Sequence, residues 1–325
     1  MASVYRIIFA PDVEVSEFRK GTDRYDECRA EIFERFKKHK FIGTGWGSLP
    51  LKAGMSEAEI RVAANAPTGQ IENFRCLCEI AENDLIWMIH KGNYYLFRVK
   101  ENKVGTNWLR EKFGDDADWY LKRDISNCFT VDICEVGNEI GVPGVVINSM
   151  SIGTTLRKIK KAPELTMDVW NRKSDSHHYN IKTVPEEWFW DLMTDRQKEG
   201  LALSYIQVKY GCIVNTESLK HSTAVYECEL IDAQGKRYLP QVKTGTSGNK
   251  AFPVKDYCKE IEKMSKELGF EAVPVLFYEN EDYGDYESKT LIKLTQKELL
   301  EFIRDYPQYI SNSVMNAYNL MYGKE

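Results

Sequence analysis

The pattern of apolar residues changes once along this chain, across a polar and basic stretch at residues 157–184. Before this stretch, short β-like runs alternate with turns rich in Gly, Asn and Asp, and residues 17–38 have the composition of a helix that Ser16 would cap. The β-like runs are residues 84–89, 94–99, 129–133 and 144–147. Many short strands with few helices favour a small β-barrel.

After the stretch, helical and β-like runs follow one another in the order α-β-β-α-β-α, which is typical of a compact α/β domain. Apolar residues at 257, 261, 264 and 268 recur with the helical period, and Gly269 provides a helix stop. The expected elements are a helix at 185–209, β runs at 223–231 and 237–243, a helix at 255–268, a strand at 272–278 and a helix opened by the capping box Thr295–Glu298.

The length of 325 residues fits two domains. The sequence therefore predicts an α+β chain with an N-terminal β-barrel over 1–160, a linker over 161–184 and an α/β domain around a mixed sheet over 185–325. We expect the basic residues at 157–161 to lie in a solvated loop, with a contact to a DNA backbone as the alternative.

Composition excludes several classes of protein. With 44 basic and 49 acidic residues the net charge is −5, so any nucleic-acid contact requires a local basic patch. No apolar run approaches the roughly 20 residues that cross a bilayer, so we expect a cytoplasmic protein without membrane contact. The eight cysteines are scattered, and the one close pair, Cys76-Leu77-Cys78, lacks the spacing of a zinc site.

The two β runs at 223–231 and 237–243 flank Ala233-Gln234-Gly235, which has the form of a three-residue hairpin loop with Gly last. That loop places Glu227 opposite Gln241, whereas a two-residue loop would shift the register by one. Because side chains alternate along strands, four polar residues then share one face. They are Glu227, Glu229, Gln241 and Lys243.

Such a face carries the chemistry of a phosphodiesterase. Carboxylate and carboxamide oxygens suit Mg²⁺, and a neighbouring lysine can orient or deprotonate an attacking water. The alternative is an ordinary hairpin whose Glu and Lys side chains form surface pairs.

Four sequence blocks in this half together resemble the catalytic domain of Mrr-like restriction endonucleases, members of the PD-(D/E)xK superfamily. The blocks are residues 199–211, 215–220, 226–228 and 241–245, and the resemblance spans roughly 185–305. In that family a helix glutamate, a strand carboxylate and a QxK triplet form the site. The resemblance implies a restriction-endonuclease-like α/β domain that binds Mg²⁺ through Glu199, Glu227 and Gln241, with Lys243 as the catalytic lysine. Glu229 is the alternative metal carboxylate, and Ser218 and Lys220 are candidate phosphate contacts.

In the first half, Gly45-Trp46-Gly47, Asn83-Asp84-Leu-Ile-Trp87 and the run 94–99 are similar to PUA/EVE-type barrels. The likeness implies an aromatic pocket that holds a flipped and often modified base. Trp46 is the first candidate, because the glycines beside it allow a close backbone approach. Trp87, Tyr95 and Trp108 follow, and ordinary core packing is the alternative for each.

These observations favour a Mg²⁺-dependent DNA endonuclease of modification-dependent or defence type. Cutting both strands requires two active sites, which favours a homodimer. The alternatives are a nucleic-acid-binding protein with a catalytically dead nuclease fold, and an interaction protein whose barrel binds a peptide or nucleotide.

Overall fold

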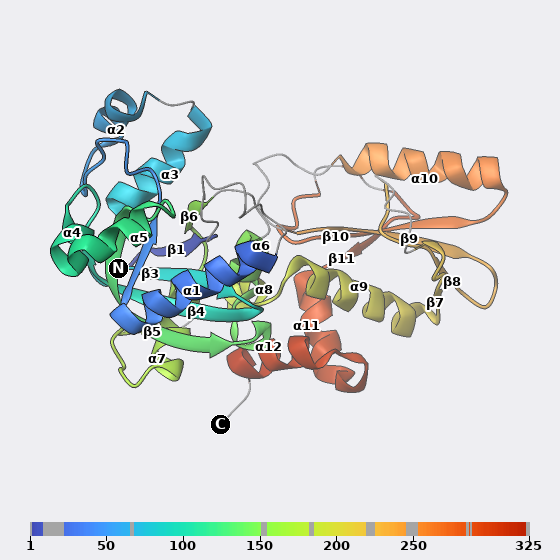
Figure 1. The fold of residues 1–325 in the computed structure, drawn as a ribbon. Helices are drawn as coiled ribbons and strands as arrows, with labels where there is room; N and C mark the ends of the chain where they lie inside the picture. Colours follow the sequence, from blue (N-terminus) through green and yellow to red (C-terminus); the bar gives the residue numbers. More distant parts are fainter. Residues whose placement is uncertain are drawn as a thin grey trace. The chain divides into compact units, whose positions relative to one another are not determined.

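The computed structural model describes residues 2–8, 23–65, 68–150, 155–181, 185–218, 225–244, 253–283, 286 and 288–322. The chain divides into two units, Met1–Leu192 and Met193–Glu325, each built on its own sheet (Figure 1). All eight cysteines are buried free thiols. Within the described ranges no helix combines the length and the apolar character that a membrane span requires.

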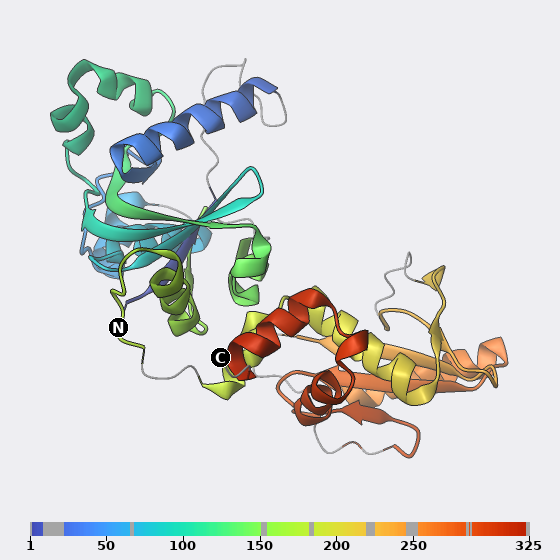
Figure 2. The ribbon, with the colours of Figure 1, turned by 90° about the horizontal axis from the view of Figure 1, so that it is seen from below.

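A six-stranded sheet, curled into a half-barrel, forms the centre of the first unit (Figure 2). The strand order is β2-β5-β4-β3-β1-β6, in which β1 and β3 are parallel and the other neighbours antiparallel. The strands are β1 (Val4–Ile7), β2 (Phe41–Thr44), β3 (Leu85–His90), β4 (Asn93–Asn102), β5 (Asn127–Gly137) and β6 (Leu156–Ile159). The helices are α1 (Asp23–His39), α2 (Glu57–Ala64), α3 (Thr68–Glu79), α4 (Trp108–Phe113), α5 (Ala117–Leu121), α6 (Gly144–Met150), α7 (Pro163–Lys173) and α8 (Phe189–Leu192), with 3₁₀ turns η2 (Gly114–Asp116), η3 (Glu139–Gly141) and η4 (Glu186–Trp188).

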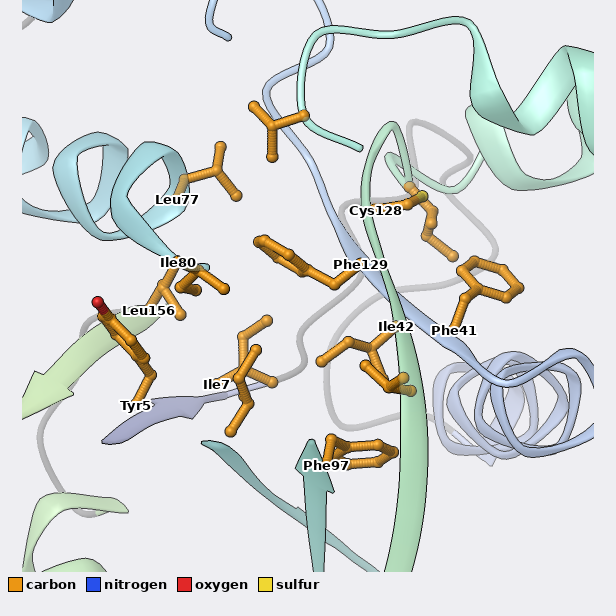
Figure 3. Packing of buried hydrophobic residues seen from close by; sticks show 14 of the residues in the cluster. Tyr5, Ile7, Phe41, Ile42, Leu77, Ile80, Phe97, Cys128, Phe129 and Leu156 are labelled. Carbon is orange, nitrogen blue, oxygen red and sulfur yellow. The ribbon is translucent and has the colours of Figure 1, made fainter. Parts of the chain in front are cut away.

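Both faces of this sheet are covered, and each has its own apolar cluster. One cluster joins Leu77 of α3 to strand residues such as Phe97 and Phe129 (Figure 3). Phe33 of α1 belongs to the same cluster. The other cluster joins Leu85 and Trp87 to Val146 of α6 and Trp170 of α7. The run 85–88 is apolar throughout because alternate side chains enter opposite cores.

The β3–β4 hairpin turns at Lys91 and Gly92. His90 pairs with Asn93, and Lys91 and Gly92 between them have φ of 47° and 77°. Two successive residues with positive φ define the type I′ geometry that joins twisted antiparallel strands.

The predicted linker at 161–184 is wrong, because most of this stretch is folded onto the first unit. Pro163 begins helix α7 at a position where its missing N–H costs nothing, and Met167 and Trp170 are buried. The basic residues before the helix are also placed: Lys158 lies in β6 and pairs with Glu79 at 3.9 Å. The outer face of α7 is polar, so the sequence of this stretch was interpreted as a linker rather than as an amphipathic helix.

Two other expectations in the first unit change. The apolar run 144–147, expected as a strand, belongs to helix α6, which follows Pro143. A four-residue apolar run fits either element, so its length left the choice open. The helix expected at 17–38 is α1 from Asp23 onward, while Ser16 lies outside the described residues.

The second unit contains a five-stranded mixed sheet in the order β11-β10-β9-β8-β7. Strands β9, β10 and β11 are parallel to one another, and β8 is antiparallel to both of its neighbours. The strands are β7 (Ile213–Val214), β8 (Leu230–Ile231), β9 (Arg237–Lys243), β10 (Ala272–Tyr278) and β11 (Ile292–Leu294). The helices are α9 (Asp195–Tyr210), α10 (Val254–Leu268), α11 (Gln296–Asp305) and α12 (Asn312–Tyr322), with the 3₁₀ turn η6 (Pro307–Tyr309).

Helices cover both faces of this sheet: α10 lies on one face, and α9 and α11 lie on the other (Figure 1). Ile261 of α10 packs in a buried cluster with Leu239 and Leu276 of the sheet. Tyr205 of α9 meets Phe302 of α11 edge to face, with ring centroids 5.4 Å apart. The mixed α/β architecture of this half agrees with the sequence-based expectation.

Local signals set the helix ends in this unit. Gly269 ends α10 with a φ of 70°, and the capping box Thr295–Glu298 opens α11, both as expected. The single helix expected over 185–209 is instead divided into η4, α8 and α9. A second capping box, in which Thr194 accepts from the N–H of Gln197 at 3.2 Å, starts α9 afresh.

The segment 174–181, after α7, is held by polar contacts to the first sheet. The Tyr179 hydroxyl donates to the Asn83 carbonyl at 2.7 Å. His178 Nε2 lies 2.9 Å from Asn83 Oδ1, and its Nδ1 and Nε2 lie 3.1 Å and 3.0 Å from the same Arg98 nitrogen. A neutral ring accepts from the guanidinium through whichever nitrogen carries no proton. Burial and then the positive charge of Arg98 lower the pKa of His178.

We expect this segment to loosen at acidic pH. A lowered folded-state pKa means that the unfolded segment binds the proton more readily, so the contact is fully stable above about 6.5 and weakens below it. Hydrogen exchange of 174–181, corrected for intrinsic rates, should be severalfold faster at pH 5.5 than at pH 7.5. His178→Gln, which stays neutral, should remove this difference, and His177→Gln should keep it. Equal protection of wild type at both pH values would contradict the assignment.

Candidate functional site

The hairpin at 230–238 has the register that the sequence predicts. Asp232 N donates to Lys236 O at 3.1 Å, which closes the three-residue loop 233–235. Gly235 has a φ of 81°, and Asp232 Oδ1 accepts from the backbone N–H of Gln234 at 2.9 Å. The glycine and the aspartate therefore fix this loop locally.

Within the described residues, the strand expected over 223–231 forms only at Leu230–Ile231, so Glu227 lies before β8 and outside the paired residues, yet its side chain contacts Gln241. The Gln241 amide donates to Glu227 Oε1 at 2.5 Å, and Gln241 is 3% exposed. The Glu227 backbone N–H donates to Pro240 O at 2.8 Å, one residue away from the partner that a regular ladder would give. The backbone is thus irregular before β8, and the two side chains still meet.

Lys243 ends β9 two residues after Gln241, so both side chains leave the same side of the strand. Tyr278 of β10 pairs with Lys243, and the next residue, Glu279, donates its N–H to Lys243 O at 3.0 Å. The half-buried Lys243 is therefore positioned by backbone contacts with the end of β10.

Glu199 joins the group from the second turn of α9. Burial raises the pKa of its carboxyl, and the negative charge of Glu227 raises it further. The charge of Lys243 acts in the opposite direction. Glu199 is therefore within electrostatic range of Glu227 and Lys243. Of the four residues expected of the site, Glu227 and Gln241 are in contact, Lys243 follows Gln241 on β9, and Glu199 is related to them through these charges.

The donor set of this cluster suits Mg²⁺ better than a metal held wholly by protein. Within the described ranges, no three His, Cys, Asp or Glu side chains come together closely enough to hold a metal ion. Mg²⁺ keeps several waters and needs one or two carboxylates, and Glu199 and Glu227 are the carboxylates that could serve it. The Gln241 amide, which now donates to Glu227, would offer its oxygen after a half-turn of the amide group.

Glu229, the alternative metal carboxylate, has a different role. It is 8% exposed, and its oxygens are bonded to Asn215, at 2.7 Å, and to Arg237. The Ser218 hydroxyl donates to Asn215 O at 2.6 Å and accepts from Glu229 N at 2.9 Å. Glu229 and Ser218 therefore fasten the turn after β7. Lys220 lies outside the described residues.

Sequence reasoning missed a buried ion pair beside this cluster. Lys198 Nζ lies 2.9 Å from Glu279 Oε2, and Lys198 is 3% exposed. One signal was present: Lys198, Leu201 and Tyr205 share the spacing of an apolar helical stripe, so the lysine occupies an inward position.

The four aromatic residues proposed for a base pocket do not converge. Trp87 is fully buried on the α7 face, where its Nε1–H donates to Thr166 Oγ1 at 3.1 Å. Tyr95, Trp46 and Trp108 belong to the cluster on the opposite face of the sheet. For Trp87 the core alternative is therefore correct, because a side chain with no exposed surface cannot stack on a base.

The glycines on either side of Trp46 are required for close packing of the backbone. A Cβ at Gly45 would lie 1.8 Å from the Asp124 carboxylate, and one at Gly47 would lie 2.5 Å from Ser126 Cβ. These glycines let the chain after β2 lie against the segment that leads into β5. Trp46 has a φ of 67° and meets Phe74 edge to face at 5.3 Å.

A cavity of about 270 Å³ lies beside this glycine segment, within the first unit. Its lining includes Gly47, Lys52, Gly105 and Asn107, and none of the four candidate aromatic residues. A Cβ at Gly105 would lie 2.1 Å from Leu51 O, so the wall requires glycine there.

Buried Asn127 joins the two loops that frame the cavity. Its Nδ2 donates to Gly45 O at 2.6 Å, and its Oδ1 accepts from Gly105 N at 3.4 Å. The cavity is close to the small end of ligand pockets, about 300–1,000 Å³, which suits a planar group the size of a base.

Two tryptophan variants should separate packing from binding. We expect Trp87→Ala to lower the free energy of unfolding by about 3–5 kcal/mol, because it removes a fully buried ring. We expect Trp46→Ala, at a partly exposed ring, to lower it by about 1–2 kcal/mol. Urea denaturation followed by circular dichroism measures both values. Equal losses would contradict the difference in burial.

Comparisons with protein-family models, with curated proteins and with solved structures find no match for this chain. The functional interpretation therefore depends on the arrangement of the chain's own residues. In the second unit that arrangement is the cluster of Glu199, Glu227, Gln241 and Lys243, and in the first unit it is the cavity beside Gly47.

Proposed function

We propose that the second unit is the catalytic domain of a Mg²⁺-dependent DNA endonuclease with a restriction-endonuclease-like fold, similar to the Mrr-like group. The observation that carries the proposal is the meeting of Gln241 and Glu227 at 2.5 Å, next to Lys243 and within electrostatic reach of Glu199. A helix carboxylate, a strand carboxylate and a QxK triplet are the parts that this resemblance implies.

In this proposal each side chain has a separate task. Gln241 of β9 and Glu227, just before β8, would hold the cation, and Glu199 would reach it from α9. When bound, Mg²⁺ supplies positive charge that stabilises the phosphorane-like transition state and helps to activate water. Lys243 orients the attacking water and helps to neutralise the phosphate, because its flexible ammonium can donate three hydrogen bonds.

The first unit would then select the DNA. We place the base-reading site in the cavity beside Gly47, which supports the proposal by its size and by the cationic Lys52 in its lining. Arg110 also lines the cavity and is paired with Asp118 at 2.8 Å. A flipped, modified base would enter the cavity while Lys52 contacts a phosphate. In this proposal the curled half-barrel sheet would take the part of the PUA/EVE-like barrel, and a homodimer would supply the second active site for the other strand.

A second candidate is a nucleic-acid-binding protein whose nuclease fold is catalytically dead. The hydrogen bond from the Gln241 amide to Glu227 favours it, because the pair is already satisfied without a cation. Metal-dependent cleavage by the wild-type protein decides between the two candidates.

Lys243→Ala should abolish cleavage while DNA binding remains, because the lysine acts mainly in the transition state. Lys243→Arg should also fail, since arginine keeps its proton and its planar group fits differently. The assay is cleavage of unmodified and 5-methylcytosine-containing plasmid DNA with Mg²⁺ or EDTA, alongside a gel-shift assay.

The matched control is Lys236→Ala, on the same hairpin, whose ammonium pairs with exposed Glu271 at 2.7 Å. This variant should cut like wild type. Undiminished cleavage by Lys243→Ala would show that the active site lies elsewhere, and no metal-dependent cleavage by wild type would favour the dead-nuclease candidate.

Filling the cavity should impair recognition of modified DNA. Asn107 lines the cavity, makes no side-chain cap contact with α4 and is exposed, so Asn107→Trp should occupy the space without unfolding the unit. We expect the affinity for modified DNA to fall by about 1–3 kcal/mol, the range for a lost base contact. Asn93→Trp, at the exposed β3–β4 turn, is the control. Equal binding by both variants and wild type in a gel-shift titration would exclude the cavity as the reader.

A further inference from the structure

A buried ion pair connects the helix and the strands of the proposed catalytic site. Lys198 Nζ lies 2.9 Å from Glu279 Oε2, and the two side chains are 4% and 11% exposed. Lys198 comes from the inward face of α9, and Glu279 directly follows β10. The pair lies wholly within the second unit.

Stability alone does not account for this pair. Removing two charges from water is costly, and replacing a buried pair by apolar residues of similar size is often neutral or stabilising. An apolar residue at Lys198 would also continue the buried stripe formed by Leu201 and Tyr205. An ion pair is directional whereas apolar packing is not, because its hydrogen-bond distance and angle are met at only one position of the helix.

Glu279 contacts helices α9 and α11 and the end of strand β9. Its backbone N–H donates to Lys243 O at 3.0 Å, and its carbonyl accepts from the side chain of Gln296 at the start of α11. Its carboxylate holds Lys198, the residue before Glu199. One short series of contacts thus leads from the helix carboxylate Glu199 to the strand lysine Lys243.

We propose that Lys198 and Glu279 are positioning residues, which fix α9 against the end of β9 so that Glu199 faces Glu227 and Gln241. This inference rests on the proposed function, since the geometry that the pair would hold is that of the proposed Mg²⁺ site. Lys198 is not itself a catalytic lysine, because its ammonium is buried and bonded to Glu279.

The test uses the full chain with Lys198→Met, Glu279→Met and the double variant. Each single variant leaves one buried charge without its partner and should melt about 5–10 °C below wild type. The metal-free double variant should melt at the wild-type temperature. The Mn²⁺ affinity of the double variant, measured by titration calorimetry, should fall about threefold to tenfold, because the supporting contacts of a metal ligand are lost. Its kcat for plasmid cleavage should fall at least tenfold while KM stays unchanged.

Lys236→Met with Glu271→Met is the matched control. This more exposed pair, at 2.7 Å, lies where β9 and β10 begin, at the end of the sheet away from Lys243 and Glu279. The control should leave melting, Mn²⁺ affinity and kcat unchanged. A double variant of the buried pair that melts well below wild type would mean that the pair is merely structural, and one with wild-type Mn²⁺ affinity and kcat would overturn the inference.

The outcomes also separate this inference from the proposed function. Wild type that binds Mn²⁺ but cuts no DNA overturns the nuclease proposal, and the Mn²⁺ affinity of the double variant then decides the inference. Wild type that binds no Mn²⁺ overturns both.

Discussion

The backbone pairing of strand β9 is the constraint on which the second unit depends. The strand is antiparallel to β8 on one side and parallel to β10 on the other. Gln241 of β9 contacts Glu227 just before β8, and the pairing with β10 brings Glu279 to Lys243. A slip of one residue between β9 and β10 would break the contact of Glu279 with Lys243. The placement of Lys243 beside Glu279 is therefore a consequence of sheet register before it is a matter of side-chain chemistry.

Where a local signal determines the backbone, sequence reasoning was sufficient. Gly235 supplies the positive φ that its turn requires, and Gly269 ends α10 in the same way. These residues act within a few positions of themselves, so no tertiary context is needed to interpret them. The loop at Gly235 sets the register of residues 230–238, but Glu227 lies beyond the paired residues and contacts Gln241 despite a one-residue offset of its backbone.

Where the outcome depends on partners far along the chain, sequence reasoning failed. Trp87 is core because α7, some 80 residues later, covers its face of the sheet and Thr166 accepts its N–H. The same covering converts an apparent linker into a helix. Lys198 and Glu279 are 81 residues apart, and the sequence around either residue does not indicate its partner. Only the helical spacing of Lys198 marks it as an inward residue.

The fold holds Glu199 where its charged form is disfavoured, and such a cost is easier to explain at a functional site than at a structural one. Burial and the charge of Glu227 both raise the pKa of Glu199, so the fold disfavours the charged carboxylate it holds there. For an acid with a raised pKa this penalty grows as pH rises through the ordinary glutamate range and persists at neutral pH. Lys243 offsets part of it. A cation bound as proposed would offset more of it, and local penalties of this kind occur at functional sites.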